Sequence, residues 1–228
     1  MVQALIFDVF GTCVDWRSSV ARAVSEQLPA ADPTLFAEAW RGEYDPAMAR
    51  IRDGERGYVP LDDLHLENLE RVCANLGLTC PDPARLNKAW EALAPWPDVV
   101  DGLHKMRPHA LLAPCSNGSI AMMARLARHA GLPWDCILGA EIAQDYKPAP
   151  AVYRAACAAL RLDPSEVMMV AAHNGDLAAA QAEGLKTAFV VRPTEYGAMQ
   201  QTDLDPEGDW DYVAGDFVAL AQMIWPEG

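Results

Sequence analysis

The first residues of the chain place a carboxylate directly after a short apolar segment. Residues 4–7, Ala-Leu-Ile-Phe, are followed by Asp8 and by a turn that contains Gly11. In open α/β sheets the ligand crevice lies at the carboxyl ends of the parallel strands, so a carboxylate there is held rigidly and partly shielded from water. A carboxylate nucleophile needs such a position. The segment therefore predicts an α/β fold in which Asp8 is the candidate nucleophile.

The residue two places after Asp8 restricts the chemistry further. Enzymes that transfer phosphoryl groups through an aspartate usually carry a second acid there, which protonates the leaving oxygen. In this chain the position is occupied by Phe10, which has no proton to donate. A nucleophile without that acid suits a leaving group that departs as a stable anion, such as a halide.

Further apolar segments predict a parallel sheet. Strand-like sequences recur at residues 110–115, 136–139, 167–170 and 187–191. Helical stretches separate them, and this alternation is typical of a doubly wound, Rossmann-like parallel sheet. We therefore expect an α/β fold with helices packed on the sheet.

A helical region interrupts this sheet after its first strand. Apolar positions at helical spacing occupy residues 18–27, 33–48, 61–76 and 83–93. The Pro-Trp-Pro sequence at 95–97 is a plausible return hinge. We predict a discontinuous α/β core domain of residues 1–15 and 96–228, with a helical cap domain of residues 16–95 inserted after the first strand.

Polar groups follow three later strands, where a parallel sheet would bring them near Asp8. The sequence Ser-Asn-Gly-Ser at 116–119 precedes a helix, and hydroxyl, amide and free N–H groups at a helix N-terminus can bind an anion. Lys147 precedes a proline, and Asp176 opens an alanine-rich helix. Each group also has an ordinary structural explanation, as an N-cap, a solvated charge and a partner of the helix dipole. Their order on successive strands is the stronger signal.

This order resembles the haloacid dehalogenase superfamily, whose four motifs are an aspartate nucleophile, a Ser or Thr, a Lys and one or more acids. Asp8, Ser116, Lys147 and Asp176 match these motifs. The closest resemblance is to the type II L-2-haloacid dehalogenases. It rests on Phe-Asp-Val-Phe-Gly-Thr at 7–12, Ala-Trp-Arg at 39–41, Ser-Asn-Gly-Ser at 116–119, and Tyr-Lys-Pro at 146–148 followed by Tyr153.

The resemblance implies hydrolysis of short L-2-haloalkanoic acids to D-2-hydroxy acids and halide, without a metal or other cofactor. Asp8 would displace the halide and form an ester, which water would then hydrolyse at the aspartyl carbonyl. Lys147 would keep Asp8 ionised, and Asp176 would position or activate the water. The family also leads us to expect a homodimer.

Other site residues are carried over by position. Arg41 and Asn117 would reach the departing halide, although an isolated arginine on a helix is commonly a surface charge. Ser116 and the Thr12 hydroxyl would position the substrate carboxylate and the nucleophile. The remaining expected substrate contacts are Val9, Phe10, Tyr58, Tyr153 and His173. For Tyr153, an apolar helix face is nearly as good an explanation.

A Mg²⁺-dependent phosphatase of the same superfamily is the first alternative. Such an enzyme needs several oxygen ligands for its cation. The phosphatases supply one of them four residues before the position of Asp176, where this chain has Ala172. Because Phe10 also replaces an acid, we expect no metal site.

The last motif departs from many relatives, which carry serine and asparagine at the positions of Ala171 and His173 and often an aromatic residue at that of Gly175. His173 could take over the placing of water or substrate, or it could be a hydrogen-bonded supporting residue. These departures leave a second alternative, a catalytically idle protein that binds small anions.

The charge of the chain restricts its partners. The 228 residues carry a net charge of −14, and the sequence pI is about 4.6. Nucleic acids and anionic membranes would repel such a chain. It contains no apolar run of the roughly 18 to 20 residues that a membrane span requires, and its first residues lack the features of a signal peptide. We therefore expect a cytoplasmic protein with a small-molecule substrate.

Overall fold

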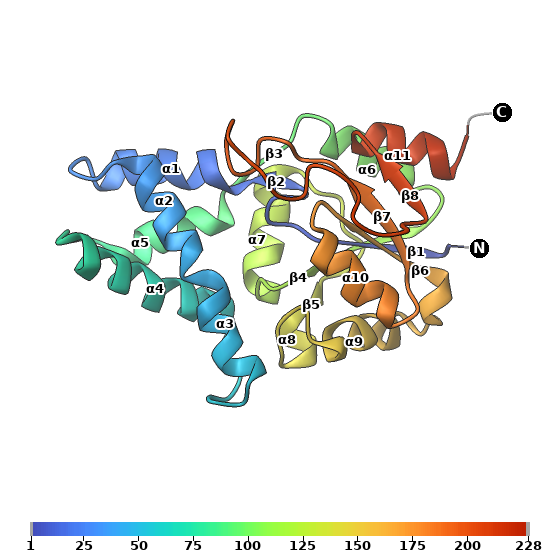
Figure 1. Ribbon diagram of the computed structural model, residues 1–228, viewed down its shortest axis with the longest axis horizontal. Helices are drawn as coiled ribbons and strands as arrows, with labels where there is room; N and C mark the ends of the chain where they lie inside the picture. The colour runs from blue at the N-terminus through green and yellow to red at the C-terminus, as the bar shows by residue number, and fades with distance from the viewer. Residues whose placement is uncertain (1, 227–228) are drawn as a thin grey trace.

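The computed structural model, which describes residues 2–226, is built around a six-stranded sheet (Figure 1). All neighbouring strands in the order β5-β4-β1-β6-β7-β8 are parallel. The strands are β1 (Ala4–Phe7), β4 (Leu111–Ser116), β5 (Leu138–Gly139), β6 (Val167–Ala171), β7 (Lys186–Val190) and β8 (Tyr212–Ala214). Because β1 lies between β4 and β6, Asp8 emerges near the middle of the sheet.

Helices cover both faces of the sheet, as side chains alternate along each strand. Leu5 and Phe7 of β1 pack in one apolar cluster with α6 (Val99–Met106), α7 (Ile120–Ala130) and α11 (Phe217–Ile224). Ala4 and Ile6 belong to the cluster on the other face, with α9 (Pro150–Leu160) and α10 (Asn174–Ala182). Short helical turns complete this part: α8 (Ala140–Ala143) and η2 (Pro164–Glu166). The predicted doubly wound α/β fold is confirmed.

The segment between β1 and β4 forms a separate group of helices, which we call the helical block (residues 16–93). It lies beside the sheet in Figure 1. Its elements are α1 (Trp16–Gln27), α2 (Pro33–Gly42), α3 (Tyr44–Arg52), α4 (Leu61–Leu76), α5 (Pro83–Asn87) and the 3₁₀ turn η1 (Lys88–Glu91). Where the chain enters and leaves the block, β2 (Val14–Asp15) and β3 (Ala94–Pro95) pair antiparallel. The domain boundaries at residues 15 and 96 stay a prediction.

Three features differ from the expectations. The predicted helix 33–48 is two helices, because Pro46 lacks an N–H and is tolerated only in a first turn, so that a new helix begins at Tyr44. The predicted helix 83–93 tightens to a 3₁₀ turn after Asn87. Strands β2, β3 and β8 were not predicted.

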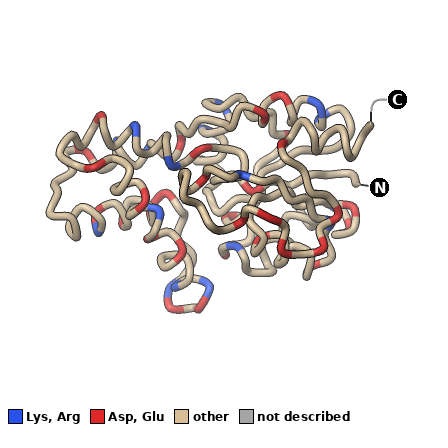
Figure 2. Tube along the Cα trace, turned by 45° about the horizontal axis from the view of Figure 1, so that its top comes forward, with Lys and Arg blue, Asp and Glu red and all other residues tan. Residues whose placement is uncertain are grey.

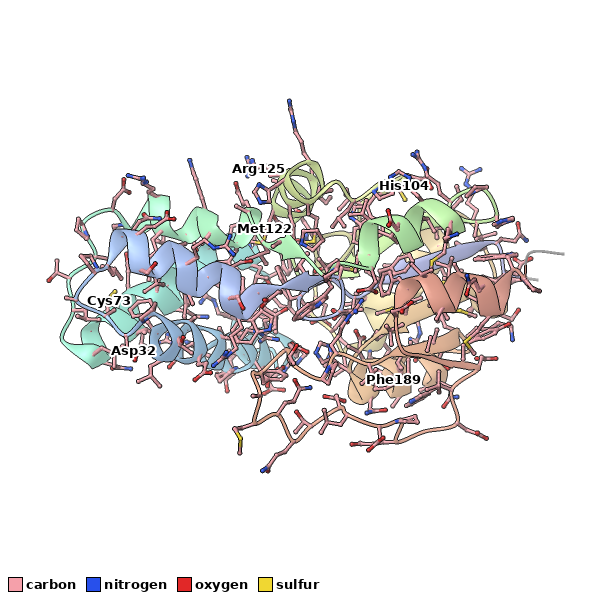
Figure 3. The ribbon with its side chains drawn as sticks, turned by 90° about the horizontal axis from the view of Figure 1, so that it is seen from above. Asp32, Cys73, His104, Met122, Arg125 and Phe189 are labelled. Atoms are coloured by element: carbon pink, nitrogen blue, oxygen red, sulfur yellow. The ribbon has the colours of Figure 1, made fainter. Side chains whose placement is uncertain are left out.

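Helix α7, which follows β4, packs against the helical block. Figure 3 shows it end-on between the block and α6, with Met122 and Arg125 labelled. Arg125 Nη1 lies 2.7 Å from Glu91 Oε1 in η1, and this ion pair joins the two parts.

Charged residues are spread over the whole molecule. In Figure 2 the Lys and Arg positions are scattered among more numerous Asp and Glu positions, on the helical block as well as around the sheet. Within residues 2–226, no helix is long and apolar enough to cross a membrane.

Candidate active site

Asp8 follows β1 directly and is almost completely buried, with 7% of its surface exposed. Its backbone N–H donates to the Val170 carbonyl at 3.0 Å, which fixes the strand end. Thr12, in the following turn, donates its hydroxyl proton to Asp8 Oδ2 at 2.7 Å. The Thr12 oxygen in turn accepts from the Ala172 N–H at 2.9 Å, so the direction of the Thr12 hydroxyl is set by the end of β6.

Lys147 links Asp8 to Asp176. Its ammonium lies 2.8 Å from Asp8 Oδ1 and 2.5 Å from Asp176 Oδ2. The other oxygen of Asp176 accepts from the Tyr153 hydroxyl at 2.5 Å. The predicted residues Asp8, Lys147, Asp176 and Tyr153 therefore form one continuous hydrogen-bonded chain.

The charges of this chain determine its protonation. Burial by itself would raise the pKa of Asp8, but the Lys147 ammonium and the His173 ring outweigh burial and hold this pKa well below its ordinary value. Burial likewise acts to lower the pKa of Lys147, and the carboxylates of Asp176 and Asp8 raise it above its ordinary value. At neutral pH, Asp8 is a carboxylate and Lys147 an ammonium.

Asp8 opens on a cavity of about 280 Å³ between the sheet and the helical block. Two lining residues, Arg41 and Tyr44, come from α2 and α3 of the block. The others come from the loops after β1, β4 and β6, from the segment between α8 and α9, and from the first turn of α10. These lining residues are Asp8, Phe10, Asn117, Lys147, Pro148, His173, Gly175 and Asp176. A cavity of this size, at the low end of ligand pockets, suits a small molecule.

Two other residues that line the cavity provide groups that favour an anion. The Arg41 guanidinium lies 3.9 Å from the centre of the Tyr44 ring, and among the described residues its buried Nε has no hydrogen-bond partner. Asn117 Oδ1 accepts from the Lys147 backbone N–H at 2.8 Å. The Asn117 NH₂ group also bonds the Tyr44 hydroxyl, and because it carries two protons, one is left for a ligand.

Several predicted residues lie around the cavity rather than in its wall. Val9 is fully buried in the core behind Asp8. Ser116 Oγ accepts from the Gly118 N–H at 3.1 Å and shapes the turn that carries Asn117. Tyr58 stacks at a tilt on Tyr146, with 5.4 Å between the ring centres, outside the cavity.

Glu195 and Tyr44 belong to the site but were not predicted. Glu195 lies in the loop after β7, only 1% exposed, and its Oε2 is 2.9 Å from Nε2 of His173. Nδ1 of the same ring is 3.2 Å from Asp8 Oδ2. The available signal was the strand-end rule that had identified the other residues, since Glu195 follows the strand predicted at 187–191. Tyr44 follows Arg41 by three residues, but a helix break separates them.

The groups that could bind a metal ion are few. Among residues 2–226, no group of three or more His, Cys, Asp and Glu side chains is arranged to hold one. Phe10 lines the cavity beside Asp8, and Ala172 is buried at the end of β6. The positive charge that faces both Asp8 and Asp176 belongs to Lys147.

Comparisons with known proteins agree with this geometry. A family model for haloacid dehalogenase-like hydrolases matches residues 2–184. The (S)-2-haloacid dehalogenase of Pseudomonas sp. (strain YL) is 31% identical over 196 residues, covering 84% of this chain and 83% of that protein. The chain therefore belongs to the haloacid dehalogenase-like hydrolase family, and the predicted resemblance to it is confirmed.

Solved structures give the same result. A defluorinating L-2-haloacid dehalogenase is 43% identical, with a TM-score of 0.95, and the match covers 97% of this chain and 94% of the other. Another L-2-haloacid dehalogenase is also 43% identical, with a TM-score of 0.96 over the full length of both chains. The similarity thus includes both the sheet and the helical block.

Proposed function

We propose that this protein hydrolyses short L-2-haloalkanoic acids to D-2-hydroxy acids and halide, through an ester on Asp8 and without a metal. The observation that carries the proposal is the ionised, buried Asp8, which lines a small cavity together with Arg41 and Asn117. The activities named for its relatives, at 31% and 43% identity, support the substrate class.

In the first step, a carboxylate oxygen of Asp8 attacks the carbon that carries the halogen, and the halide leaves with the bonding electrons. The Arg41 guanidinium and the Asn117 NH₂ stabilise the departing anion. No acid is required because the halide is stable without a proton. Attack from the side opposite the halide inverts the carbon once, so an L-acid gives a D-product.

In the second step, water attacks the carbonyl carbon of the Asp8 ester. Asp176 lies near this ester, held by Lys147 and Tyr153, and is the group that orients the water. The Lys147 ammonium provides the charge that a cation would supply in a phosphatase, and this supports a reaction without metal.

The test is halide release from L- and D-2-chloropropionate and from chloroacetate, with and without excess chelator. We expect turnover of the L-acid and of chloroacetate, no effect of the chelator, and D-lactate as the product. Asp8→Asn should abolish turnover with an unchanged circular dichroism spectrum, because an amide does not displace halide. Loss of activity in chelator with recovery in Mg²⁺, or faster hydrolysis of a phosphate monoester, would replace the proposal with a phosphatase.

A further inference from the structure

The His173 ring lies between two carboxylates. Its Nδ1 is 3.2 Å from Asp8 Oδ2, and its Nε2 is 2.9 Å from Glu195 Oε2. The other oxygen of Glu195 accepts from the indole N–H of Trp16 at 3.0 Å. Both oxygens of Glu195 are therefore held, and the carboxylate fixes the orientation of the ring.

This arrangement determines the protonation of the ring. A neutral histidine has one N–H and one bare nitrogen, and the bare nitrogen would face a carboxylate without a proton between them. With an acceptor on each side, both nitrogens carry protons. Burial acts to lower the pKa of His173, but the charge of Glu195 and the hydrogen bonds to Asp8 and Glu195 raise it well above its ordinary value.

The two oxygens of Asp8 are in different surroundings. Oδ1 accepts from the Lys147 ammonium, whereas Oδ2 accepts from both the Thr12 hydroxyl and His173 Nδ1. Two donors that converge on one oxygen form the arrangement that stabilises a developing oxyanion. Oδ1, which has the single donor, is the oxygen that attacks the substrate, and Oδ2 then becomes the carbonyl oxygen of the ester.

We propose that His173, kept as an imidazolium by Glu195, acts with Thr12 as the oxyanion-stabilising pair for hydrolysis of the ester on Asp8. His173 touches the reacting carboxyl group and is a catalytic residue, whereas Glu195 acts through it and is a positioning residue. This inference rests on the proposed function, because it assigns a role within the second step of that reaction.

Hydrolysis of the ester begins with the addition of water. The oxygen of water bonds to the carbonyl carbon, and the electron pair of the C=O double bond moves to Oδ2, which the two donors stabilise. The pair then returns and the bond between this carbon and Oδ1 breaks, which releases the hydroxy acid. One proton of the water goes to the leaving oxygen, and the other goes to solvent as Asp8 ionises again.

The experiment measures the two steps separately with L-2-bromopropionate. Rapid quench gives the bromide released in the first turnover, and mass spectrometry of the intact protein detects the Asp8 ester. In His173→Gln we expect a bromide burst equal to the enzyme concentration, an accumulated ester, and a steady-state rate lower on the order of 10²-fold. Glu195→Gln keeps the size of the side chain and removes its charge, and it should show the same pattern at about a tenfold loss. The exposed His104 and Glu26 provide matched controls, and His104→Gln and Glu26→Gln should behave as the wild type.

The outcomes are distinguishable. An unchanged rate in both variants, or a slow rate without accumulated ester and without a burst, would overturn the role of His173 and leave the proposed function in place. If the wild type releases no halide from any 2-haloacid, the proposed function fails, and the inference fails with it. Circular dichroism of each variant confirms that a lower rate belongs to a folded protein.

Discussion

Gly11 lies in the turn after Asp8 and has a φ angle of +88°. A Cβ at this position would be 2.1 Å from Glu195 Oε1 and 2.2 Å from its carboxyl carbon. Gly11→Ala therefore forces the buried Glu195 carboxylate to move, without any change of charge in the protein. Gly54 also has a positive φ, +76°, but nothing lies within 4 Å of its added Cβ. Gly54→Ala is the matched control.

Both substitutions force an alanine into a left-handed backbone conformation, and only Gly11→Ala also displaces Glu195. The left-handed conformation costs an alanine about 1 to 2 kcal/mol at either position. At Gly11 the displaced Glu195 also loses its hydrogen bond to Trp16 or to His173, each worth about 1.5 to 3 kcal/mol because the acceptor is charged. We therefore expect Gly11→Ala to lower the free energy of unfolding by about 1.5 to 3 kcal/mol more than Gly54→Ala, the value of one such hydrogen bond.

Urea unfolding, followed by tryptophan fluorescence and by circular dichroism, measures this difference. Both variants must show the wild-type m value, the slope of the unfolding free energy against urea concentration. A difference below about 1 kcal/mol would show that the loop around Glu195 moves aside at little cost, and would refute a rigid placement of the Glu195 carboxylate.

Three further predictions follow from the site. Arg41→Lys should lower kcat for 2-haloacids about tenfold to a hundredfold, because an ammonium lacks the reach and fork of a guanidinium; the exposed Arg50→Lys is the control, and equal rates would remove Arg41 from the site. The double substitution Phe10→Asp and Ala172→Asp should create Mg²⁺ affinity, measured by calorimetry, and should slow dehalogenation because the cation competes with Lys147 for the charge of Asp8. Unimpaired turnover with Mg²⁺ bound would contradict this. The raised pKa of His173 adds stability that is complete below its unfolded-state pKa of about 6.5 and is lost as pH rises through the folded-state pKa. The wild-type advantage in unfolding free energy over His173→Gln should therefore shrink above about pH 6.5, by up to about 1.4 kcal/mol per pH unit, and an advantage independent of pH would exclude a charged ring.

Short-range patterns predicted much of the fold and site. The apolar strands and the polar residues that follow them located Asp8, Asn117, Lys147 and Asp176, because parallel strands bring their carboxyl ends to one edge of the sheet. This rule depends only on the order of elements, so it holds even where strand ends are misplaced by a residue or two.

The unpredicted features have different physical causes. Glu195 is 22 residues beyond His173 in an irregular loop, and no periodicity brings the two side chains together. Strand β8 has only three residues, which are too few to show an alternating pattern, and its Val213 is exposed. For the break before Tyr44 a local signal existed in Pro46, but the helical spacing of apolar residues continues across it.

The antiparallel pair β2 and β3 has a mechanical consequence. Val14 is paired with Pro95 and Asp15 with Ala94, so the two connections to the helical block are tied to each other and cannot move independently. The paired strands β2 and β3 thus form a single hinge between the helical block and the sheet. The hinge is also bonded to the turn after Asp8, because the Trp96 indole N–H donates to the Gly11 carbonyl at 2.8 Å. A rotation that carried Arg41 away from the cavity would therefore also pull on the turn that follows Asp8.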